Sequence, residues 1–485
     1  MRSTYLDNET EIMELYLDKD IFNFRRTFDY LLNAPENRLP SDEFSQMGVE
    51  LIIRPECNQK CEYCYIARYG KELYPLNERI QPDQIVKHVD MLLDYIFNEK
   101  HIYMHHWELF AGDMFYDNLY FDVLDVFYKH LEPLYLKYPN IFDTNEGLIL
   151  TPTNFSFIED EAKAARVNEY IDKFQRINWD IGFSVSTDGK YAVDTREQRP
   201  LDDAYFDKLF QWVIDHPRNG FHPIISASNV KNSIKNYEWW RDMYAKWFGG
   251  PDNHRGFLPY WLEARNDEWD VESIRQFNKL LDFMIKDRLK MCNNNIDHLA
   301  YHLFNGDGAN GTLPKPELAD MLDITFPRQA SERENIGCSL SSLVCFNIAD
   351  LSLVPCHRTT YHQFRGGNFI VENDKITKFV AKNPAGFLNM VMAPSDSLPR
   401  CAKCKYNTIC HKGCLGAQFE ASGEPFLPAI SVCQLEMASR YCIIKTLFDM
   451  GVLDSAYRQG IIPSEAWYVY TSILEDDSLG VYMEW

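Results

Sequence analysis

Residues 48–65 read GVELIIRPECNQKCEYCY. The apolar run at 48–54 predicts a β-strand, and Cys57, Cys61 and Cys64 follow it with the spacing Cys-x3-Cys-x2-Cys. Loops at the carboxyl ends of parallel strands form the active sites of α/β proteins. A 4Fe–4S cubane normally takes four cysteines, so three would leave one iron open. The alternative is zinc, which requires a fourth ligand at close range, and the neighbouring sequence offers none.

Downstream of this loop, helical and strand patterns alternate, which predicts βαβ units and a parallel sheet. Strands are expected at 48–54, 101–110, 147–150, 179–185, 222–227 and 257–263, and helices at 83–98, 119–137, 159–175, 202–215, 231–247 and 270–291. Six units are fewer than the eight of a complete barrel. The expected fold class is therefore α/β, with a partial (β/α)6 TIM-like barrel.

The bulk composition is that of a folded protein of more than one domain. The 485 residues are 46% hydrophobic, and the formal net charge is −22. Such an acidic surface repels phosphate backbones, so nucleic acid is not an expected partner. The first residues lack an apolar signal core, and no stretch looks long enough to span a membrane, so we expect a cytoplasmic protein. Its 13 cysteines would stay reduced there, which favours metal ligation over disulfides.

Nine of the 13 cysteines lie between positions 338 and 442. The array is Cys338, Cys345, Cys356, Cys401, Cys404, Cys410, Cys414 and Cys433. Eight cysteines are what two fully ligated cubanes require, although a pair of zinc sites is the alternative. The two remaining cysteines downstream of the first loop, Cys292 and Cys442, lie in predicted helices and are expected to be buried packing residues.

The first cysteine loop, placed after the first strand, resembles that of the radical S-adenosylmethionine (SAM) superfamily. The resemblance implies that Cys57, Cys61 and Cys64 bind a 4Fe–4S cluster whose open iron binds SAM. An electron from the cluster then cleaves SAM to methionine and a 5′-deoxyadenosyl radical, which abstracts hydrogen from the substrate. Tyr63 and Tyr65, beside the cysteines, are expected to contact the cofactor.

Four later segments resemble the cofactor-binding loops of the same family. Ala111-Gly112-Asp113-Met114 stands where the family has a Gly-Gly-Glu-Pro-like motif that binds the amino group of SAM, and Asp113 can accept hydrogen bonds from an ammonium. Asn154 follows the third strand. Ser186 and Asp188 belong to a Ser-x-Asp-Gly-like turn after the fourth strand. The cofactor contacts implied by the resemblance are Gly112, Asp113, Met114, Asn154, Ser184, Ser186, Asp188 and Arg196. Ser186 and Arg196 would hold the SAM carboxylate, a role suited to a guanidinium.

The C-terminal array resembles the SPASM domain, an auxiliary extension of radical SAM enzymes that act on peptides and proteins. The resemblance implies one 4Fe–4S cluster on Cys338, Cys345, Cys356 and Cys414. It implies another on Cys401, Cys404, Cys410 and Cys433. His357 follows Cys356, where sulfatase maturases carry an Asp. This histidine is a candidate proton acceptor, and the alternative is a hydrogen bond to a cluster sulfur or a backbone carbonyl.

These resemblances lead to one functional hypothesis. The chain is expected to be a radical SAM peptide or protein maturase with three 4Fe–4S clusters, SAM and a flavodoxin- or ferredoxin-type electron donor. The product would be a crosslink or an oxidation. Alternatives are sulfatase maturation, a small-molecule substrate, and a non-catalytic iron–sulfur electron carrier. The expected segments are a helical extension (1–46), the barrel (47–294), a loop-rich linker (295–335), the auxiliary α+β domain (336–442) and a C-terminal extension (443–485).

Overall fold

A computed structural model describes most of the chain. The described residues are 31–32, 48–144, 146–192, 202–216, 218–249, 268–305, 343–391, 398, 400–410 and 414–485. Arg196, Cys338, the strand expected at 257–263 and nearly all of the N-terminal extension lie outside them.

One sheet organises the described residues. Its strands are β1 Gly48–Arg54, β2 His106–Ala111, β3 Gly147–Thr153, β4 Trp179–Val185, β5 Gly220–Phe221, β6 Leu343–Asn347, β7 Ser352–Val354, β8 Gly367–Glu372 and β9 Lys375–Ala381. They run in the order β5-β4-β3-β2-β1-β6-β7-β8-β9. The pairs from β5 to β6 are parallel, and the pairs from β6 to β9 are antiparallel.

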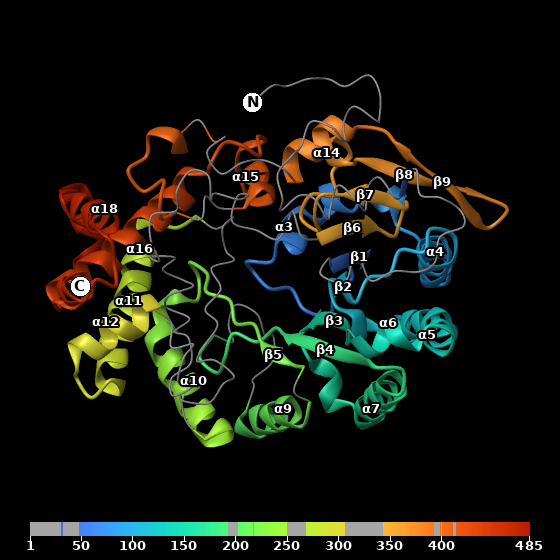
Figure 1. Cartoon of the computed structure of the whole chain (residues 1–485), viewed down its shortest axis with the longest axis horizontal. Coiled ribbons are helices and arrows are strands. Elements are labelled where there is room, and N and C mark those ends of the chain that lie inside the picture. Colours follow the sequence, from blue (N-terminus) through green and yellow to red (C-terminus); the bar gives the residue numbers. More distant parts are fainter. Residues whose placement is uncertain are drawn as a thin grey trace.

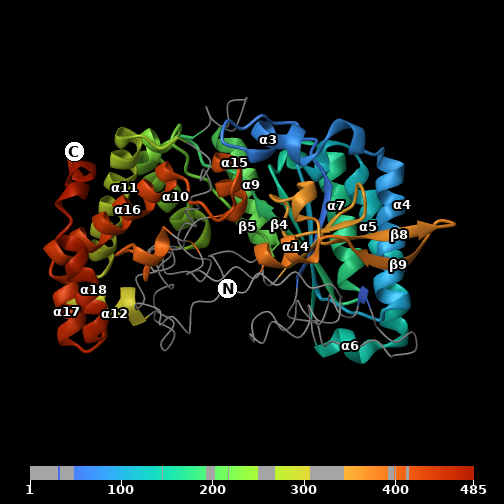
Figure 2. The same cartoon turned by 90° about the horizontal axis from the view of Figure 1, so that it is seen from above.

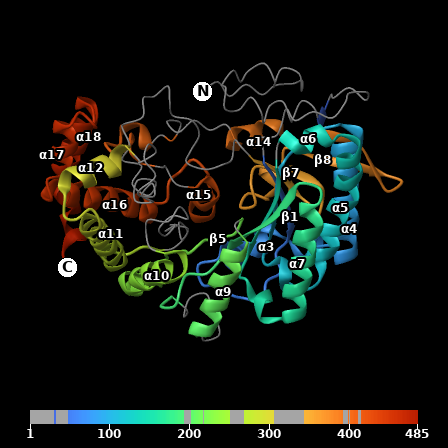
Figure 3. The ribbon, with the colours of Figure 1, turned by 60° about the horizontal axis from the view of Figure 1, so that its bottom comes forward.

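Helices alternate with the strands in the first half of the chain, and the last of them follow β5. They are α3 Tyr65–Leu73, α4 Pro82–Leu93, α5 Leu119–Lys137, α6 Pro139–Thr144, α7 Glu161–Gln175, α9 Asp203–Asp215, α10 Ser233–Phe248, α11 Val271–Met291 and α12 Ile296–Asn305. Short 3-10 or π turns lie at Leu76–Glu78, Asp94–Glu99, Met114–Tyr116, Ser156–Glu159 and Val230–Asn232. Helices α4, α5, α7 and α9 follow one another around the strands (Figure 1), and α9 lies beside β5 (Figure 3). The chain therefore has the expected α/β fold, with a partial parallel barrel.

The C-terminal half is mostly helical after its strands. Its helices are α14 Pro384–Val391, α15 Leu415–Ser422, α16 Ile430–Asp449, α17 Val452–Arg458 and α18 Ser464–Leu474, with 3-10 turns at His362–Phe364, Cys401–Lys403 and Asp477–Met483. Helices α16, α17 and α18 group with α11 and α12 at one end of the molecule, away from α4 and α5 (Figure 2). The predicted boundary between 442 and 443 falls inside α16, so the structure has no break there.

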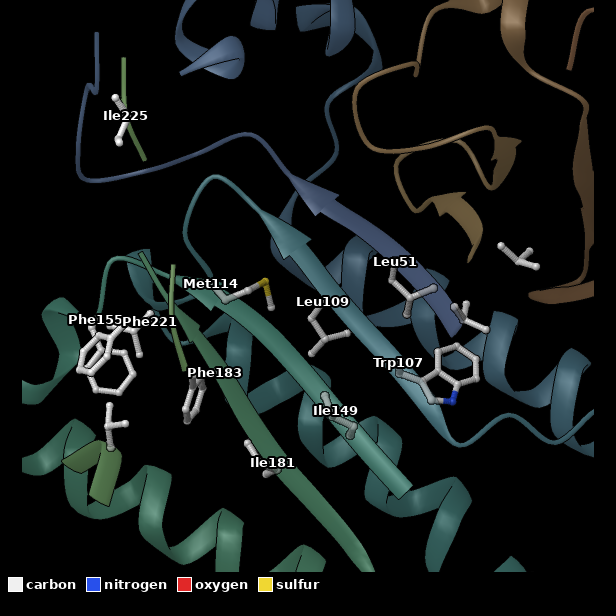
Figure 4. Packing of buried hydrophobic residues seen from close by; sticks show 14 of the residues in the cluster. Leu51, Trp107, Leu109, Met114, Ile149, Phe155, Ile181, Phe183, Phe221 and Ile225 are labelled. Atoms are coloured by element: carbon white, nitrogen blue, oxygen red, sulfur yellow. The ribbon is translucent and has the colours of Figure 1, made fainter. Parts of the chain in front are cut away.

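The core lies between the sheet and its outer helices. Leu51, Leu109, Ile149 and Ile181 project from four adjacent strands into one layer (Figure 4), and each is at most 3% exposed. The alternate residues of these strands face the other side of the sheet because side chains alternate along a strand. This alternation leaves the inner face of the barrel for the site.

Two expected segments are wrong in part. The strand expected at 222–227 is replaced by the two-residue β5, because Pro223 has no backbone N–H to continue the ladder. The expected linker begins with helix α12 instead. Leu299, Leu303 and Phe304 are buried at helical spacing in α12, which packs against α17.

Candidate active site

The three-cysteine loop leaves β1 at its carboxyl end. Cys57, Cys61 and Cys64 are all partly exposed, and Cys64 is the N-cap residue of helix α3. The N–H of Cys64 donates to the carbonyl of Cys61 at 3.1 Å. The N–H of Gln59 lies 3.4 Å from the Cys57 Sγ. A loop of this kind presents its thiols at the surface together with backbone donors that stabilise negative charge on sulfur.

The loop after β2 lies in backbone contact with the cysteine loop. The Gly112 N–H donates to the Arg54 carbonyl at 2.9 Å, and the Asp113 N–H donates to the Glu56 carbonyl at 2.8 Å. A Cβ on Gly112 would come within 2.3 Å of the carbonyl oxygens of Pro55 and Glu56. Gly112 therefore allows a close approach that any side chain would prevent.

Asp113 joins the β2 loop to the β3 loop. Its Oδ1 accepts from the Phe115 N–H at 2.8 Å, and its Oδ2 accepts from the Asn154 N–H at 2.9 Å and the Thr153 hydroxyl at 3.1 Å. Burial raises the pKa of this carboxyl group, which is 1% exposed. Both oxygens thus accept from protein donors, and the expected contact of Asp113 with a ligand's ammonium stays a prediction. Met114, also expected at the cofactor, lies fully buried in the hydrophobic core.

Asn154 reaches the cysteine loop from the end of β3. Its Nδ2 donates to the Asn58 Oδ1 at 2.5 Å and lies 4.0 Å from the Cys57 Sγ. The Asn58 amide in turn donates to the Ser156 hydroxyl at 3.0 Å. The structure therefore brings Asn154 to the cysteine loop, and its expected contact with the cofactor stays a prediction.

Asp188 braces the turn after β4. Its carboxylate accepts from the Tyr63 hydroxyl and, at 2.9 Å, from the Ile224 N–H. Its backbone carbonyl accepts from the side chains of Asn236 and Trp240 on α10. Asp188 and Tyr63 are both buried, so they connect the cysteine loop to the β4 turn. Their polar groups bind each other in the structure, and their expected contacts with the cofactor stay predictions.

Two serines on this edge remain partly exposed. The Ser186 N–H donates to the Thr153 carbonyl at 2.8 Å, which joins the β4 turn to the end of β3. The Ser184 hydroxyl lies 3.1 Å from the His222 Nδ1, just after β5. His222 is a site residue that the sequence analysis missed, since a lone histidine after a short strand gives no signal.

Four of the predicted auxiliary ligands surround one cavity. Cys401, Cys404, Cys410 and Cys433 line it with largely apolar neighbours that include Val432. Burial, together with the nearby Cys401 and Cys404 thiols, raises the pKa of the Cys433 thiol to about 11. This donor set fits the four thiolates that a fully ligated cubane takes, and it matches the quartet expected from the sequence. The side chains are not drawn together around a metal ion: within the described ranges, no three His, Cys, Asp or Glu side chains are close enough to share one.

The other auxiliary set is described for three of its four members. Cys345 on β6 is buried and pairs with Val354 of β7. Cys356 lies two residues after Val354 along the chain. Cys414 precedes α15, where a Cβ on Gly416 would come within 2.9 Å of the Arg358 Cγ. The start of α15 therefore packs on the segment that follows Cys356. Cys338 lies outside the described residues.

A buried ion pair links these segments. Arg358 donates to Glu420 of α15 at 2.6 and 2.9 Å, and its guanidinium lies 4.9 Å from the ring centre of Tyr65. Tyr65 directly follows Cys64. A single arginine thus contacts both the first cysteine loop and α15, beside the auxiliary cysteines.

His357 lies between the two cysteine regions. Its Nδ1 is 2.9 Å from both carboxylate oxygens of Glu50 on β1. Its ring stacks on Phe110, with centroids 4.0 Å apart and an interplanar angle of 8°. Glu50 was not predicted as a site residue. The signal in the sequence was a carboxylate between the apolar residues Val49 and Leu51 of the predicted strand.

Comparison with known proteins adds a distant likeness. No family model matches the chain, and no curated protein matches it either. Among solved structures, the chain is similar to "Native anSMEcpe with bound AdoMet and Cp18Cys peptide", with 16% sequence identity, a TM-score of 0.46, and coverage of 86% of this chain and 99% of that chain. A likeness of this strength decides neither the family nor the reaction.

Within the described residues, no helix is both long and apolar enough to cross a membrane.

Proposed function

We propose that the chain is a radical SAM enzyme that modifies a residue of a peptide or protein. The observation that carries the proposal is the packing of the three-cysteine loop. The loops after β2 and β3 contact it directly, through Gly112 and Asn154, and Tyr63 ties it to the turn after β4. Three thiols at this edge leave one coordination position of a cubane for a further ligand.

In this proposal, Cys57, Cys61 and Cys64 hold the first 4Fe–4S cluster. The chemistry that cluster and SAM supply when bound is one-electron reductive cleavage of SAM, followed by hydrogen abstraction from the substrate. The proposed cofactor contacts are Tyr63, Tyr65, Gly112, Asp113, Met114, Asn154, Ser184, Ser186, Asp188 and Arg196. Among them, Gly112, Asp113, Asp188 and Tyr63 also hold the surrounding loops together.

Two further clusters belong to the same proposal. Cys401, Cys404, Cys410 and Cys433 would hold one, and Cys338, Cys345, Cys356 and Cys414 the other. Full ligation by four thiolates gives these clusters a role in electron transfer or in stabilising the fold. His357, next to Cys356, would accept a proton from the substrate.

The partners follow from this chemistry. The proposed substrate is a ribosomally made peptide or a protein, and the electron donor is of the flavodoxin or ferredoxin type. The cytoplasm is the proposed location, because it keeps the cysteines reduced.

The test is the triple replacement of Cys57, Cys61 and Cys64 with Ala. Iron content should fall by about one third, because one cubane of three is lost, and formation of 5′-deoxyadenosine from SAM should stop. The reconstituted protein is assayed with dithionite for both quantities. Cys292→Ala is the matched control, since Cys292 is buried at the end of α11 and belongs to no proposed cluster. Continued SAM cleavage by the triple variant would contradict the proposal, as would absence of cleavage by the wild-type protein.

A further inference from the structure

Helix α16 carries two charged side chains beside a cavity of the auxiliary region. The α16 cavity is the one lined by Cys401, Cys404, Cys410 and Cys433. Glu436 lines the same cavity, and Arg440 follows it after one helical turn. Cys433, Glu436 and Arg440 stand three and four residues apart, so they share one face of the helix. The name α16 cluster denotes the 4Fe–4S cluster proposed for this cavity.

The two charged side chains pair with each other inside the protein. The Arg440 Nη2 lies 3.3 Å from the Glu436 Oε2, and the side chains are only 5% and 9% exposed. The Arg440 Nε–H also donates to the carbonyl of Ile409 at 3.1 Å. Ile409 directly precedes Cys410 in the chain. The guanidinium therefore joins the helix that carries Cys433 to the loop that carries Cys410.

Stability alone does not explain a buried pair of this kind. Removing two charges from water is costly, and apolar residues of similar volume often stabilise a fold as well or better. Four thiolates give a bound cubane a net negative charge. Charges near such a cluster change its reduction potential, and they act strongly where water is excluded.

We propose that Glu436 and Arg440 set the reduction potential of the α16 cluster. The carboxylate on the cavity wall disfavours the added electron, and the guanidinium next to it favours that electron and limits the effect. The step concerned is one-electron reduction of the cluster, with the electron supplied by the proposed flavodoxin- or ferredoxin-type protein. This inference rests on the proposed function, in which the four cysteines hold a cluster that transfers electrons.

The test is a potentiometric titration of the reconstituted full-length protein, followed by electron paramagnetic resonance. Glu436→Gln removes the negative charge and keeps the shape of the side chain. The reduction equilibrium of the α16 cluster should move about tenfold toward the reduced form, which raises the midpoint by about 59 mV for one electron. Arg440→Gln removes the positive charge and should move the equilibrium about tenfold the other way. The signal of the α16 cluster is the one that Cys433→Ser alters, and the other clusters are internal references.

Opposite signs distinguish this role from a purely structural one. If the pair only stabilised the fold, both single variants would loosen the same loop, and the midpoint would move in one direction or not at all. Either result would overturn the inference. The double variant Glu436→Gln/Arg440→Gln removes both charges, so its equilibrium should lie between those of the two single variants. A double variant displaced further than either of them would also contradict the proposal.

Asp449→Asn is the matched control on the same helix. Asp449 and Lys445 form another pair four residues apart at 2.8 Å, but their side chains are 55% and 39% exposed. This variant should leave every midpoint unchanged, because water and salt screen exposed charges.

Two milder variants keep the inference testable if either Gln variant does not fold. Glu436→Asp and Arg440→Lys retain the charges, so their equilibria should stay within about threefold of wild type. A tenfold change in either would contradict a role that depends on charge. SAM cleavage at the first cluster does not enter these measurements, so unmoved midpoints reject the inference while the proposed function stands. Absence of any signal that depends on Cys433 would reject both the α16 cluster and the inference.

Discussion

Gly112 is the residue through which two loops of the candidate site touch. Its Cα faces the carbonyls of Pro55 and Glu56 so closely that a single added carbon would come within 2.3 Å of both oxygens. Backbone atoms cannot rotate away as a side chain can. Removing such a clash would therefore require the cysteine loop to move relative to β2.

Gly112→Ala should consequently damage the first cluster site more than the rest of the molecule. Overpacking of this kind costs about 1–3 kcal/mol, and displacement of the cysteine loop should reduce iron binding at that site. Thermal unfolding and the electron paramagnetic resonance signal of the first cluster check the two effects. Gly220→Ala is the control, because no atom lies within 4 Å of the position of its added Cβ. Equal behaviour of the two variants would show that the loops do not need this contact.

At the level of single residues, the sequence points to side chains more readily than to their contacts. The resemblance to the SPASM domain groups the cysteines at 401, 404, 410 and 433, and these four line one cavity. Asp113 and Asp188 are expected at the cofactor, which stays a prediction, and in the structure their oxygens accept from backbone and tyrosine donors. A motif in the sequence shows that an acidic side chain follows a strand. The groups that donate hydrogen bonds to it belong to residues far away in the sequence, and a local pattern does not specify them.

Three of the helices, α7, α9 and α11, begin with an aspartate that caps the N-terminus. Asp160, Asp202 and Asp270 accept backbone N–H groups at the N-termini of α7, α9 and α11. Aspartate satisfies donors that have no partner inside the helix and interacts favourably with the positive end of its dipole. Each of these helices is therefore positioned from its first turn.

Asp270→Ala should destabilise α11 at neutral pH and lose this effect in acid. The Asp270 Oδ1 accepts from the Ser273 N–H and hydroxyl, both at 2.7 Å, and these bonds hold the pKa of Asp270 below its usual value. The loss should be about 1 kcal/mol at pH 7, whereas Asp270→Asn, which keeps a capping oxygen, should lose less. Because the folded pKa is depressed, the contribution is complete above the unfolded pKa of about 3.9 and disappears as the pH falls through the folded value. Urea midpoints between pH 7 and pH 3 check this, and equal midpoints for wild type and Ala at pH 7 would contradict it.

Elements were predictable where periodicity was strong and local. The helix at 119–137 and the strand at 179–185 have the expected bounds. The strand after β4 was misplaced because its apolar run includes Pro223, and β5 ends before it. Helix α12 was missed because its buried leucines stand at the start of a loop-rich segment, where composition favoured a linker.

The sheet unites the two halves of the molecule. Strand β6 adds to β1 in parallel register, with Gly48 opposite Leu343 and Ile52 opposite Asn347. Helix α16 packs along α11, and the Cys442 thiol contacts the Asn278 carbonyl at 3.3 Å. The change in cysteine content near 338 predicted an appended domain. The pairing of β6 with β1 joins residues far apart in the sequence, and neither composition nor cysteine spacing predicts it.

A chain truncated after residue 305 should therefore not remain a folded monomer. It would expose the edge of β1 and the face of α11 that α16 covers, and exposed edges and apolar faces promote association. Size-exclusion chromatography and circular dichroism of the truncated and full-length chains check the prediction. A monomeric truncated chain with native secondary structure would show that the first half folds independently.

The pairing of β1 with β6 also has a consequence for synthesis on the ribosome. Roughly 290 residues separate the end of β1 from the start of β6, and translation at about 5–20 residues per second takes on the order of 15–60 s to cover them. During this interval one edge of β1 has no partner strand, in a nascent chain that already carries the three cysteines of the first loop. The cell must keep that edge from pairing with other chains and those thiols from oxidation until the second half emerges.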